Sequence, residues 1–216
     1  MPAAAGVLAG GFALLVACLA VLGHLVGEIG EQESRALDTQ VNPLLHALAS
    51  PGMDDLMTAI TSLGAIPVVP VVLGLAAGML AIARRRREAA FLVVAVAGSV
   101  ALNLALKLVI HRPRPALAWA QAMPDTSFPS GHTQTAVALY VALALVAWVV
   151  AGRRTGQVAL VLAVVISAAV GLSRLYLGVH YLTDVLAGAV AGVAWLLVVG
   201  TAFEAGPALR GWREPA

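Results

Sequence analysis

Residues 181–203 read YLTDVLAGAVAGVAWLLVVGTAF, and this stretch decides the class of fold. Apart from Tyr181, which opens the stretch, Asp184 is its only ionisable residue. Ala, Val, Leu and Gly make up most of the rest. A helix needs roughly 20 predominantly apolar residues to cross the hydrocarbon core of a bilayer. The stretch therefore predicts a transmembrane helix rather than a helix of a soluble domain.

Five further stretches have the same character, and together they predict an all-α, polytopic protein with six transmembrane helices. The chain has 216 residues, of which 61% are hydrophobic and 11% charged, far from the balance of a soluble domain. Abundant Gly and Ala allow helices to approach closely in lipid. A single integral-membrane domain over residues 1–216 is expected. The other predicted spans are residues 3–26, 56–83, 89–110, 133–151 and 157–172, the last with a short extension.

The first span is expected to stay in the mature protein. No Lys or Arg precedes Arg35, so the basic region of a cleaved signal peptide is missing. Cys18, the only cysteine, lies in this span and is expected to pack as a small apolar residue. A single cysteine also excludes a disulfide within the chain.

Two other segments carry local expectations. Pro67 and Pro70 predict a kink in the second span, because proline removes a helical hydrogen bond. The linker at residues 27–51 is expected to contain a short helix on the membrane surface. Its apolar positions are Leu44, Leu45 and Leu48.

Charge is distributed unevenly between alternate loops, and this predicts the orientation. Cytoplasmic segments of membrane proteins are enriched in Lys and Arg, so both termini are expected in the cytoplasm. The basic clusters are residues 84–87, Arg153 with Arg154, and Arg210 with Arg213. The opposite loops carry acidic residues, namely Glu28, Glu31, Glu33, Asp38, Asp54 and Asp55.

Four cations break this rule at the outer ends of the third and fifth spans: Lys107, Arg112, Arg114 and Arg174. The first three lie in KLVIHRPRP, residues 107–115. Such a cluster alone is typical of side chains that anchor a helix to lipid headgroups. Its neighbours in the chain point to a further role.

Residues 127–132 read SFPSGH and stand directly before the fourth span. Ser130 and Gly131 are therefore expected at a helix N-terminus, where free N–H groups and the helix dipole favour an anion. Gly131 allows close backbone approach, and the Ser130 hydroxyl can donate one more hydrogen bond. A serine at this position, taken alone, is more often just an N-cap.

Residues 173–184 read SRLYLGVHYLTD, which puts His180 and Asp184 four positions apart at the start of the sixth span. This spacing predicts one helix face and a hydrogen bond between the two side chains. A carboxylate that accepts from one ring nitrogen leaves the other nitrogen unprotonated and more basic. That is the arrangement a nucleophilic histidine needs.

In these three stretches the chain resembles the type 2 phosphatidic acid phosphatase family, whose motifs are KxxxxxxRP, PSGH and SRxxxxxHxxxD. The motif region covers residues 107–184, and the six-span layout resembles the membrane branch of the family. The resemblance implies a helical core like that of acid phosphatases and vanadium haloperoxidases. The matching residues are Lys107, Arg114 and Pro115; Pro129, Ser130, Gly131 and His132; and Ser173, Arg174, His180 and Asp184.

Residue chemistry and resemblance lead to one expected mechanism of phosphoryl transfer. His180, held by Asp184, attacks phosphorus, and His132 protonates the leaving oxygen and later activates water. The phosphate is bound by Lys107, Arg114 and Arg174 and by donors from Ser130 and Gly131. A bell-shaped pH dependence is expected from the paired histidines.

No metal or other cofactor is expected, because the outer motif region offers only Asp125 and Asp184 as carboxylates and Asp184 is already engaged. His24, His46 and His111 are expected to be loop or interface residues, and the sequence shows no partner for them.

The expected substrate is a lipid phosphate or pyrophosphate, because the reacting groups lie at helix ends where a headgroup rests. Polyprenyl pyrophosphate, phosphatidylglycerophosphate and phosphatidic acid stay open, and so does the oligomeric state. We expect a multi-pass protein of the inner (plasma) membrane with its site on the periplasmic or extracellular side, surrounded by membrane lipids and with no nucleic-acid partner.

Two other functions fit parts of the pattern. A phosphotransferase would pass the same phosphohistidine to a lipid hydroxyl instead of water. A transporter or scramblase would need polar residues near the bilayer midplane. It is disfavoured, because the span interiors offer only non-ionisable residues, namely Asn103, Thr58, Thr61, Ser62, Ser99 and Ser167.

Overall fold

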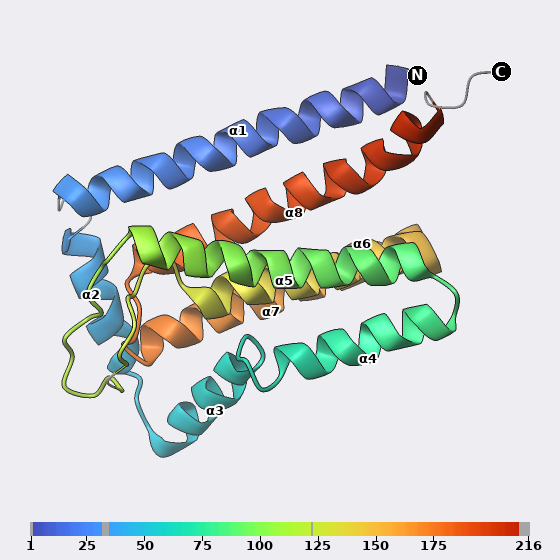
Figure 1. The fold of residues 1–216 in the computed structure, drawn as a ribbon. Helices are drawn as coiled ribbons and strands as arrows, with labels where there is room; N and C mark the ends of the chain where they lie inside the picture. Colours follow the sequence, from blue (N-terminus) through green and yellow to red (C-terminus); the bar gives the residue numbers. More distant parts are fainter. Residues whose placement is uncertain (1, 32–34, 122, 212–216) are drawn as a thin grey trace.

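The computed structural model describes residues 2–31, 35–121 and 123–211, and the regular elements in these ranges are all α-helices (Figure 1). Glu33 and Arg213, which entered the charge argument, lie outside the described residues. The helices are α1 (Pro2–Glu31), α2 (Arg35–His46), α3 (Pro51–Ser62), α4 (Val69–Ile82), α5 (Arg86–Val109), α6 (Gly131–Ala151), α7 (Arg153–Tyr176) and α8 (Leu182–Gly211).

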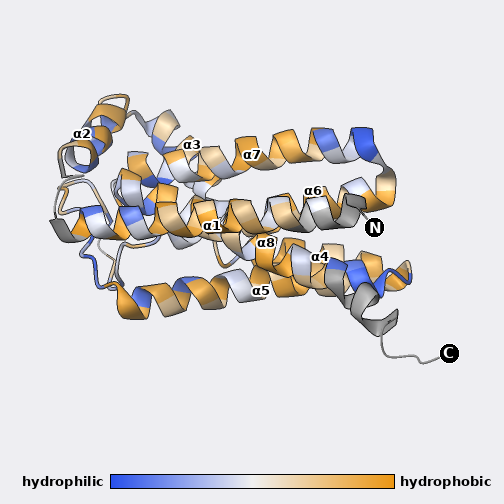
Figure 2. Ribbon diagram, turned by 90° about the horizontal axis from the view of Figure 1, so that it is seen from above, coloured by the Kyte–Doolittle hydropathy of each residue, from blue (hydrophilic) through white to orange (hydrophobic). Residues whose placement is uncertain are grey.

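Five of the described helices are long and apolar enough to cross a membrane, namely α5, α6 and α7 and the main parts of α1 and α8. They coincide with five of the six predicted spans. Figure 2 shows hydrophobic residues along the lengths of these helices. The helix α4 has 14 residues. At 1.5 Å per residue it rises roughly 21 Å, less than a hydrocarbon core of about 30 Å, so the sixth span stays a prediction.

The prediction of one kinked helix over residues 56–83 is wrong. The chain forms α3 and α4 instead, joined by a turn at residues 63–68. Pro67 lies in this turn and Pro70 in the first turn of α4, where a missing N–H does no harm. The Tyr140 hydroxyl on α6 donates a hydrogen bond to the Leu63 carbonyl at 2.9 Å. This bond satisfies one carbonyl that the break exposes.

The predicted helix in the outer linker is confirmed as α2, and its two faces differ. Leu44 on α2 and Leu48 in the turn after it are exposed, as a segment on the membrane surface requires. Asp38 and Asn42 lie on the opposite face and are 2% and 1% exposed. The helix α2 therefore covers part of the bundle rather than only resting on lipid.

The centre of the bundle is α6, which packs against α7, α8, α5 and α4. Its middle contributes to an apolar cluster shared with α5 and α8: Leu92, Ala95, Val137, Ala142, Val146, Leu196 and Val199. Its first turns are polar but also buried. Gln134 donates to the Ser99 carbonyl at 2.8 Å and accepts from Asn103 at 2.9 Å. This network fixes α5 against the start of α6.

Two glycines let other segments approach the backbone of residues 130–132. A Cβ on Gly188 of α8 would lie 2.5 Å from the Ser130 carbonyl oxygen. A Cβ on Gly64, in the turn between α3 and α4, would lie 2.7 Å from the His132 carbonyl oxygen. Only glycine permits such contacts, so α8 and the helix break both hold the first turn of α6 in place.

Candidate active site

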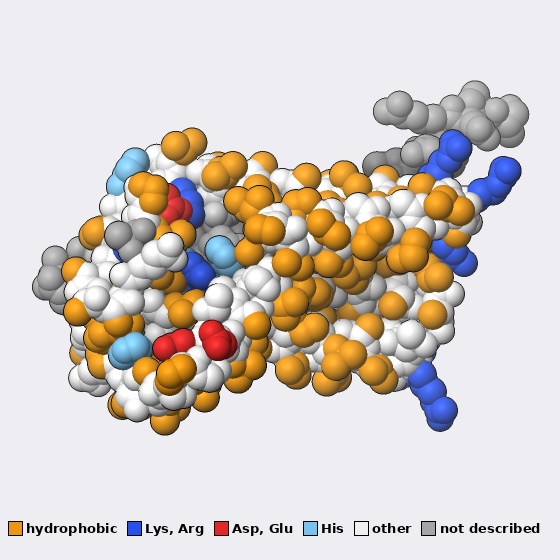
Figure 3. Space-filling view, turned by 90° about the horizontal axis from the view of Figure 1, so that it is seen from below, with side chains coloured by type: hydrophobic (Ala, Val, Ile, Leu, Met, Phe, Trp, Pro, Cys, Tyr) orange, Lys and Arg blue, Asp and Glu red, His pale blue; other side chains and the backbone are white. Residues whose placement is uncertain are grey.

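Two segments far apart in the chain meet at one end of the bundle, the motif end, which is formed by the α5–α6 loop, the α7–α8 turn and α2. Arg114 donates to the Val179 carbonyl at 2.6 Å, and the Ser130 N–H donates to the Asp184 carbonyl at 2.9 Å. Figure 3 shows histidine, basic and acidic side chains gathered around a hollow at this end. The predicted meeting of the two loops is confirmed.

His180 is held between a carboxylate and a guanidinium. Its Nδ1 lies 3.4 Å from Asp184 Oδ2, and its Nε2 lies 3.1 Å from Arg114 Nη1. The expectation that His180 lies on the last helix is wrong, because α8 begins at Leu182 and His180 belongs to the preceding turn. With Nδ1–H donating to Asp184 and Nε2 accepting from Arg114, the ring is assigned the tautomer that keeps a lone pair on Nε2.

The environment of His180 favours its neutral form. Its side chain is 2% exposed. Burial, aided by the guanidinium groups of Arg114 and Arg174, lowers the pKa of His180 to about 4 although the Asp184 carboxylate acts in the opposite direction. Near neutral pH Nε2 therefore keeps its lone pair, which can attack once the hydrogen bond from Arg114 breaks.

Asp184 is fully buried and engaged on both oxygens. Besides His180, Oδ2 accepts from the Tyr181 N–H at 2.9 Å, and Oδ1 accepts from Arg112 at 2.6 Å. Arg112 reaches Asp38 Oδ2 with its other terminal nitrogen, also at 2.6 Å. Although burial opposes it, these two carboxylates raise the pKa of Arg112. Arg112 thus stays cationic and links Asp184 to α2.

The residues from α2 are the part of the site that sequence reasoning missed. Asp38 accepts from the Thr183 N–H at 3.0 Å and from its hydroxyl at 2.7 Å. Asn42 donates to the carbonyls of Leu175 and His180, both at 3.0 Å. The sequence alone presents Asp38 as an ordinary acidic residue of an outer loop. The available signal was the spacing of four between Asp38 and Asn42, which puts two polar residues on one helix face.

Lys107 and Arg114 converge on one carboxylate. Lys107 Nζ lies 3.0 Å from Asp125 Oδ2, and Arg114 Nη2 lies 2.6 Å from Asp125 Oδ1. Lys107 also donates to the Thr126 carbonyl. Although burial opposes it, the two cations lower the pKa of Asp125, which is therefore ionised. The Asp125 carboxylate thus holds Lys107 next to Arg114, which lies 3.1 Å from His180 Nε2.

Arg174 is a buried cation with neutral partners. It is 5% exposed, donates to the Thr61 hydroxyl at 2.9 Å and lies 3.8 Å from Met123 Sδ. Its Nε is buried without a hydrogen-bond partner among the described residues. A buried charge with no ion pair among the described residues is costly, so such a group favours an incoming anion.

The start of α6 differs in detail from expectation. The Ser130 hydroxyl makes no N-cap hydrogen bond and lies 3.0 Å from the Thr133 hydroxyl. Gly131 begins the helix, and half-buried His132 lies within electrostatic range of His180, Arg174 and Arg114. The motif end thus holds all eight predicted site residues: Lys107, Arg114, Ser130, Gly131, His132, Arg174, His180 and Asp184.

Two of the three histidines set aside have partners after all. His24 Nε2 lies 3.2 Å from Glu28 Oε1, and His46 stacks on Trp119 with ring centroids 4.2 Å apart. Neither contact involves the eight predicted residues. Within the described ranges, His, Cys, Asp and Glu side chains form no group of three or more suited to a metal ion.

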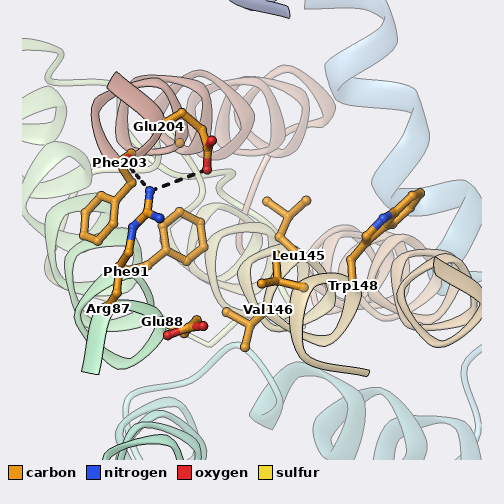
Figure 4. Close-up of a pocket in the computed structure, with 10 residues that line it drawn as sticks. Arg87, Glu88, Phe91, Leu145, Val146, Trp148, Phe203 and Glu204 are labelled. Atoms are coloured by element: carbon orange, nitrogen blue, oxygen red, sulfur yellow. Dashed lines mark hydrogen bonds and ion pairs between the residues drawn. The ribbon is translucent and has the colours of Figure 1, made fainter. Parts of the chain in front are cut away.

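A cavity of about 750 Å³ lies away from the motif end, between α5, α6 and α8. Its walls are mainly apolar, and Arg87 reaches across it to the Phe203 carbonyl and to Glu204, 3.7 Å away (Figure 4). No predicted site residue and no histidine lines it. Volume alone therefore does not locate the chemistry of this protein.

The family model described as the PAP2 superfamily matches residues 88–205, which include all three motifs. The chain belongs to the PAP2 superfamily. It is also 31% identical over 178 residues to phosphatidylglycerophosphatase B of Bacillus subtilis (strain 168), covering 81% of this chain and 87% of that protein. Decaprenylphosphoryl-5-phosphoribose phosphatase of Mycobacterium tuberculosis (strain ATCC 25618 / H37Rv) is 36% identical over 121 residues, covering 53% of this chain and 61% of that protein.

Solved structures of PAP2 proteins agree with this assignment. A crystal structure of a transmembrane PAP2 type phosphatidylglycerolphosphate phosphatase from Bacillus subtilis matches with a TM-score of 0.80 and 28% identity, covering 88% of this chain and 96% of that chain. LpxE of Aquifex aeolicus shares the fold, with a TM-score of 0.59 at 24% identity and coverage of 76% and 95%. This PAP2 protein is an integral-membrane lipid phosphatase.

Proposed function

We propose that this PAP2 protein removes a phosphate group from a lipid phosphate or pyrophosphate at the outer face of the inner (plasma) membrane, without a metal and through a phosphohistidine on His180. The observation that carries the proposal is the position of the His180 ring, with Asp184 on Nδ1 and Arg114 at Nε2. A neutral, oriented and buried imidazole beside several cations is suited to attack phosphorus.

In the first step, the Nε2 lone pair of His180 forms a bond to phosphorus as the bond from phosphorus to the leaving oxygen breaks. The leaving oxygen takes a proton from His132, which must therefore start the step protonated. The products are a free lipid alcohol, or a lipid monophosphate when the substrate is a pyrophosphate, and phosphorylated His180. Asp184 stabilises the positive charge that develops on the His180 ring.

In the second step, water attacks phosphorus and gives a proton to His132, now the general base. The bond between phosphorus and Nε2 breaks, its electron pair returns to the ring, and inorganic phosphate leaves. His132 ends the cycle protonated, as it began, so protons balance over the two steps.

The charge on the transferred group is spread over three equatorial oxygens, which positioned cations stabilise. Lys107, Arg114 and Arg174 fill this role, and buried Arg174 is the most suited to it because its described contacts are neutral. The N–H of Gly131 at the helix start and the Ser130 hydroxyl add donors.

The placement of charge supports an outward-facing site. The arginine end of the bundle, which carries residues 84–87 with Arg153 and Arg154, lies opposite the motif end (Figure 3). By the positive-inside rule the arginine end faces the cytoplasm. Headgroups of the outer leaflet then reach the site while their tails stay in the bilayer.

Phosphatidylglycerophosphate is the first substrate to test, because a relative that acts on it covers most of this chain. The purified protein, in detergent with excess EDTA, is offered phosphatidylglycerophosphate, phosphatidic acid and polyprenyl pyrophosphate. We expect inorganic phosphate from at least one lipid and a base-stable, acid-labile phosphorylated species on His180. His180→Ala should lower turnover by at least about 10³-fold.

The matched control is His111→Ala, since His111 is an exposed histidine of the same loop region. It should keep full turnover. Activity that EDTA abolishes and magnesium restores would contradict the metal-independent mechanism. Transfer of the phosphate group to a second lipid would favour a phosphotransferase.

A further inference from the structure

Asp125 binds both phosphate-site cations of the α5–α6 loop region. Its Oδ2 accepts from Lys107 at 3.0 Å, and its Oδ1 accepts from Arg114 Nη2 at 2.6 Å and from Arg114 Nε at 3.2 Å. The Asp125 carbonyl also accepts from Arg114 Nε at 3.2 Å. One carboxylate thus spans the two cations, as a phosphate group with two oxygens would.

The Nη1 group of Arg114 is also engaged. Its Nη1 donates to the Val179 carbonyl at 2.6 Å and lies 3.1 Å from His180 Nε2. The edge formed by Nε and Nη2, which suits bidentate binding of an anion, is the edge that Asp125 holds. A phosphate that binds this edge must displace the Asp125 carboxylate.

Exposure shows which partner can move. The side chain of Asp125 is 48% exposed, whereas those of Lys107 and Arg114 are 14% and 11% exposed. The cations are fixed by their surroundings, and the carboxylate can turn toward water without a large loss of hydration. Because Asp125 is ionised, the competing group carries one negative charge.

Charge then separates two classes of lipid headgroup. A phosphomonoester carries about −1.5 to −2 at neutral pH, whereas a phosphodiester headgroup carries one negative charge. Coulombic attraction to the two cations scales with that charge. A phosphodiester gains nothing over the carboxylate it replaces, but a phosphomonoester or a terminal pyrophosphate does.

We infer, on the basis of the proposed function, that Asp125 is a specificity-determining residue: its carboxylate competes for Lys107 and Arg114 and excludes the abundant phosphodiester lipids of the bilayer. The enzyme thereby selects headgroups with more than one negative charge. The residue acts on binding and takes no part in bond making or breaking.

The test compares the purified full-length protein with Asp125→Asn, which keeps the shape of the side chain and removes its charge. Phosphate release from a lipid phosphomonoester is measured in mixed micelles while phosphatidylglycerol, a monoanionic phosphodiester, is titrated in. We expect phosphatidylglycerol to inhibit Asp125→Asn at a surface concentration about tenfold lower than the parent protein, and the KM for the phosphomonoester to fall. Asp55→Asn, which alters an exposed carboxylate of α3, should match the parent.

A second readout does not depend on turnover. Inorganic phosphate and vanadate are titrated against the thermal unfolding of each protein, and Asp125→Asn should bind both more tightly. If Asp125→Asn folds poorly, Asp125→Ser replaces it. Unchanged or weaker anion binding, or unchanged inhibition by phosphatidylglycerol, overturns the inference even if the parent is an active phosphatase. Tighter anion binding by the variant of a protein that hydrolyses no lipid phosphate removes the proposed function and leaves only the competition between Asp125 and anions for the two cations.

Discussion

The two ends of the bundle use the same charged residue types in opposite ways. At the arginine end, the ion pair of Arg87 with Glu204 spans 3.7 Å, and its side chains are 54% and 77% exposed. At the motif end, Arg112 lies 2.6 Å from both Asp38 and Asp184, whose side chains are 1% and 0% exposed. Exposed ion pairs contribute little to the stability of the fold. Breaking a buried ion pair is costly because it leaves an uncompensated buried charge.

The apolar cavity and the buried reactive groups also lie in different parts of the molecule. The cavity of about 750 Å³ has mainly apolar walls and no histidine. The motif end instead has a buried imidazole, a buried carboxylate and Arg174, whose Nε has no described hydrogen-bond partner. Perturbed and incompletely paired buried groups mark the functional end, as expected for a site that must bind and transfer an anion.

The largest difference between the two ends should come from removing His132, the second imidazole at the motif end. His132→Ala removes the group assigned as general acid and general base, so kcat should fall by about 10²- to 10⁴-fold. The measurement is phosphate release from the lipid phosphate that the parent protein turns over. A loss below threefold would remove His132 from the mechanism.

Arg174→Gln tests whether a buried cation without a described carboxylate partner stabilises the transferred phosphate. The change keeps a donor but removes the charge, and kcat/KM should fall by about 10²- to 10³-fold. Anion binding followed by thermal unfolding should weaken in parallel. A variant that lost stability but kept kcat/KM would show that Arg174 is structural.

The pH profile should show the effect of burial on His180. Its lowered pKa, about 4, means that the attacking nitrogen is neutral above that pH and becomes protonated as the pH falls through it. Below pH 4, kcat/KM should fall about tenfold per unit, whereas an unperturbed histidine would begin to lose activity near pH 6.5. Because the Asp184 carboxylate raises the pKa of His180, this limb should move lower still in Asp184→Asn. A limb that stays in place would belong to the substrate or to another group.

Loss of the hydrogen bonds that Asn42 of α2 donates should have a smaller effect. Asn42→Ala leaves the Leu175 carbonyl with only the Gly178 N–H at 3.0 Å and takes the Asn42 donor from the buried His180 carbonyl, so the protein should lose about 1–3 kcal/mol of stability. Since those carbonyls belong to the segment that carries His180, kcat should also fall by about tenfold. Thr39→Ala, on the exposed face of α2, is the matched control and should lie within about 0.5 kcal/mol of the parent.

The smallest effect is expected at the arginine end. Arg87→Ala removes an exposed ion pair, so stability should change by less than about 1 kcal/mol and kcat by less than about twofold. Thermal unfolding and phosphate release measure both. A large loss of kcat would mean that the two ends are coupled and would weaken the comparison.

Much of the site could be predicted because its motifs keep a fixed order in the chain and the loops that carry them lie on one side of the predicted spans. The split of the second span could not, because a proline in an apolar run can either kink a helix or end it. The outcome depended on Tyr140 and on the close approach of Gly64 to the His132 carbonyl. Both partners lie on a helix that is distant in sequence.

By itself, the sequence determined that the chain is a polytopic helical membrane protein with its motif residues at one end, since length, apolar composition and loop charge are local properties. Only the tertiary structure decided that Asp38 and Asn42 hold the turn that carries His180, that Arg112 links Asp38 to Asp184, and that Asp125 spans Lys107 and Arg114. Asp38 and Thr183 are 145 positions apart, and Asp38 and Arg112 are 74 apart. A side chain's own sequence neighbourhood does not specify a partner at such a distance, because burial and charge pairing are set by how the helices pack.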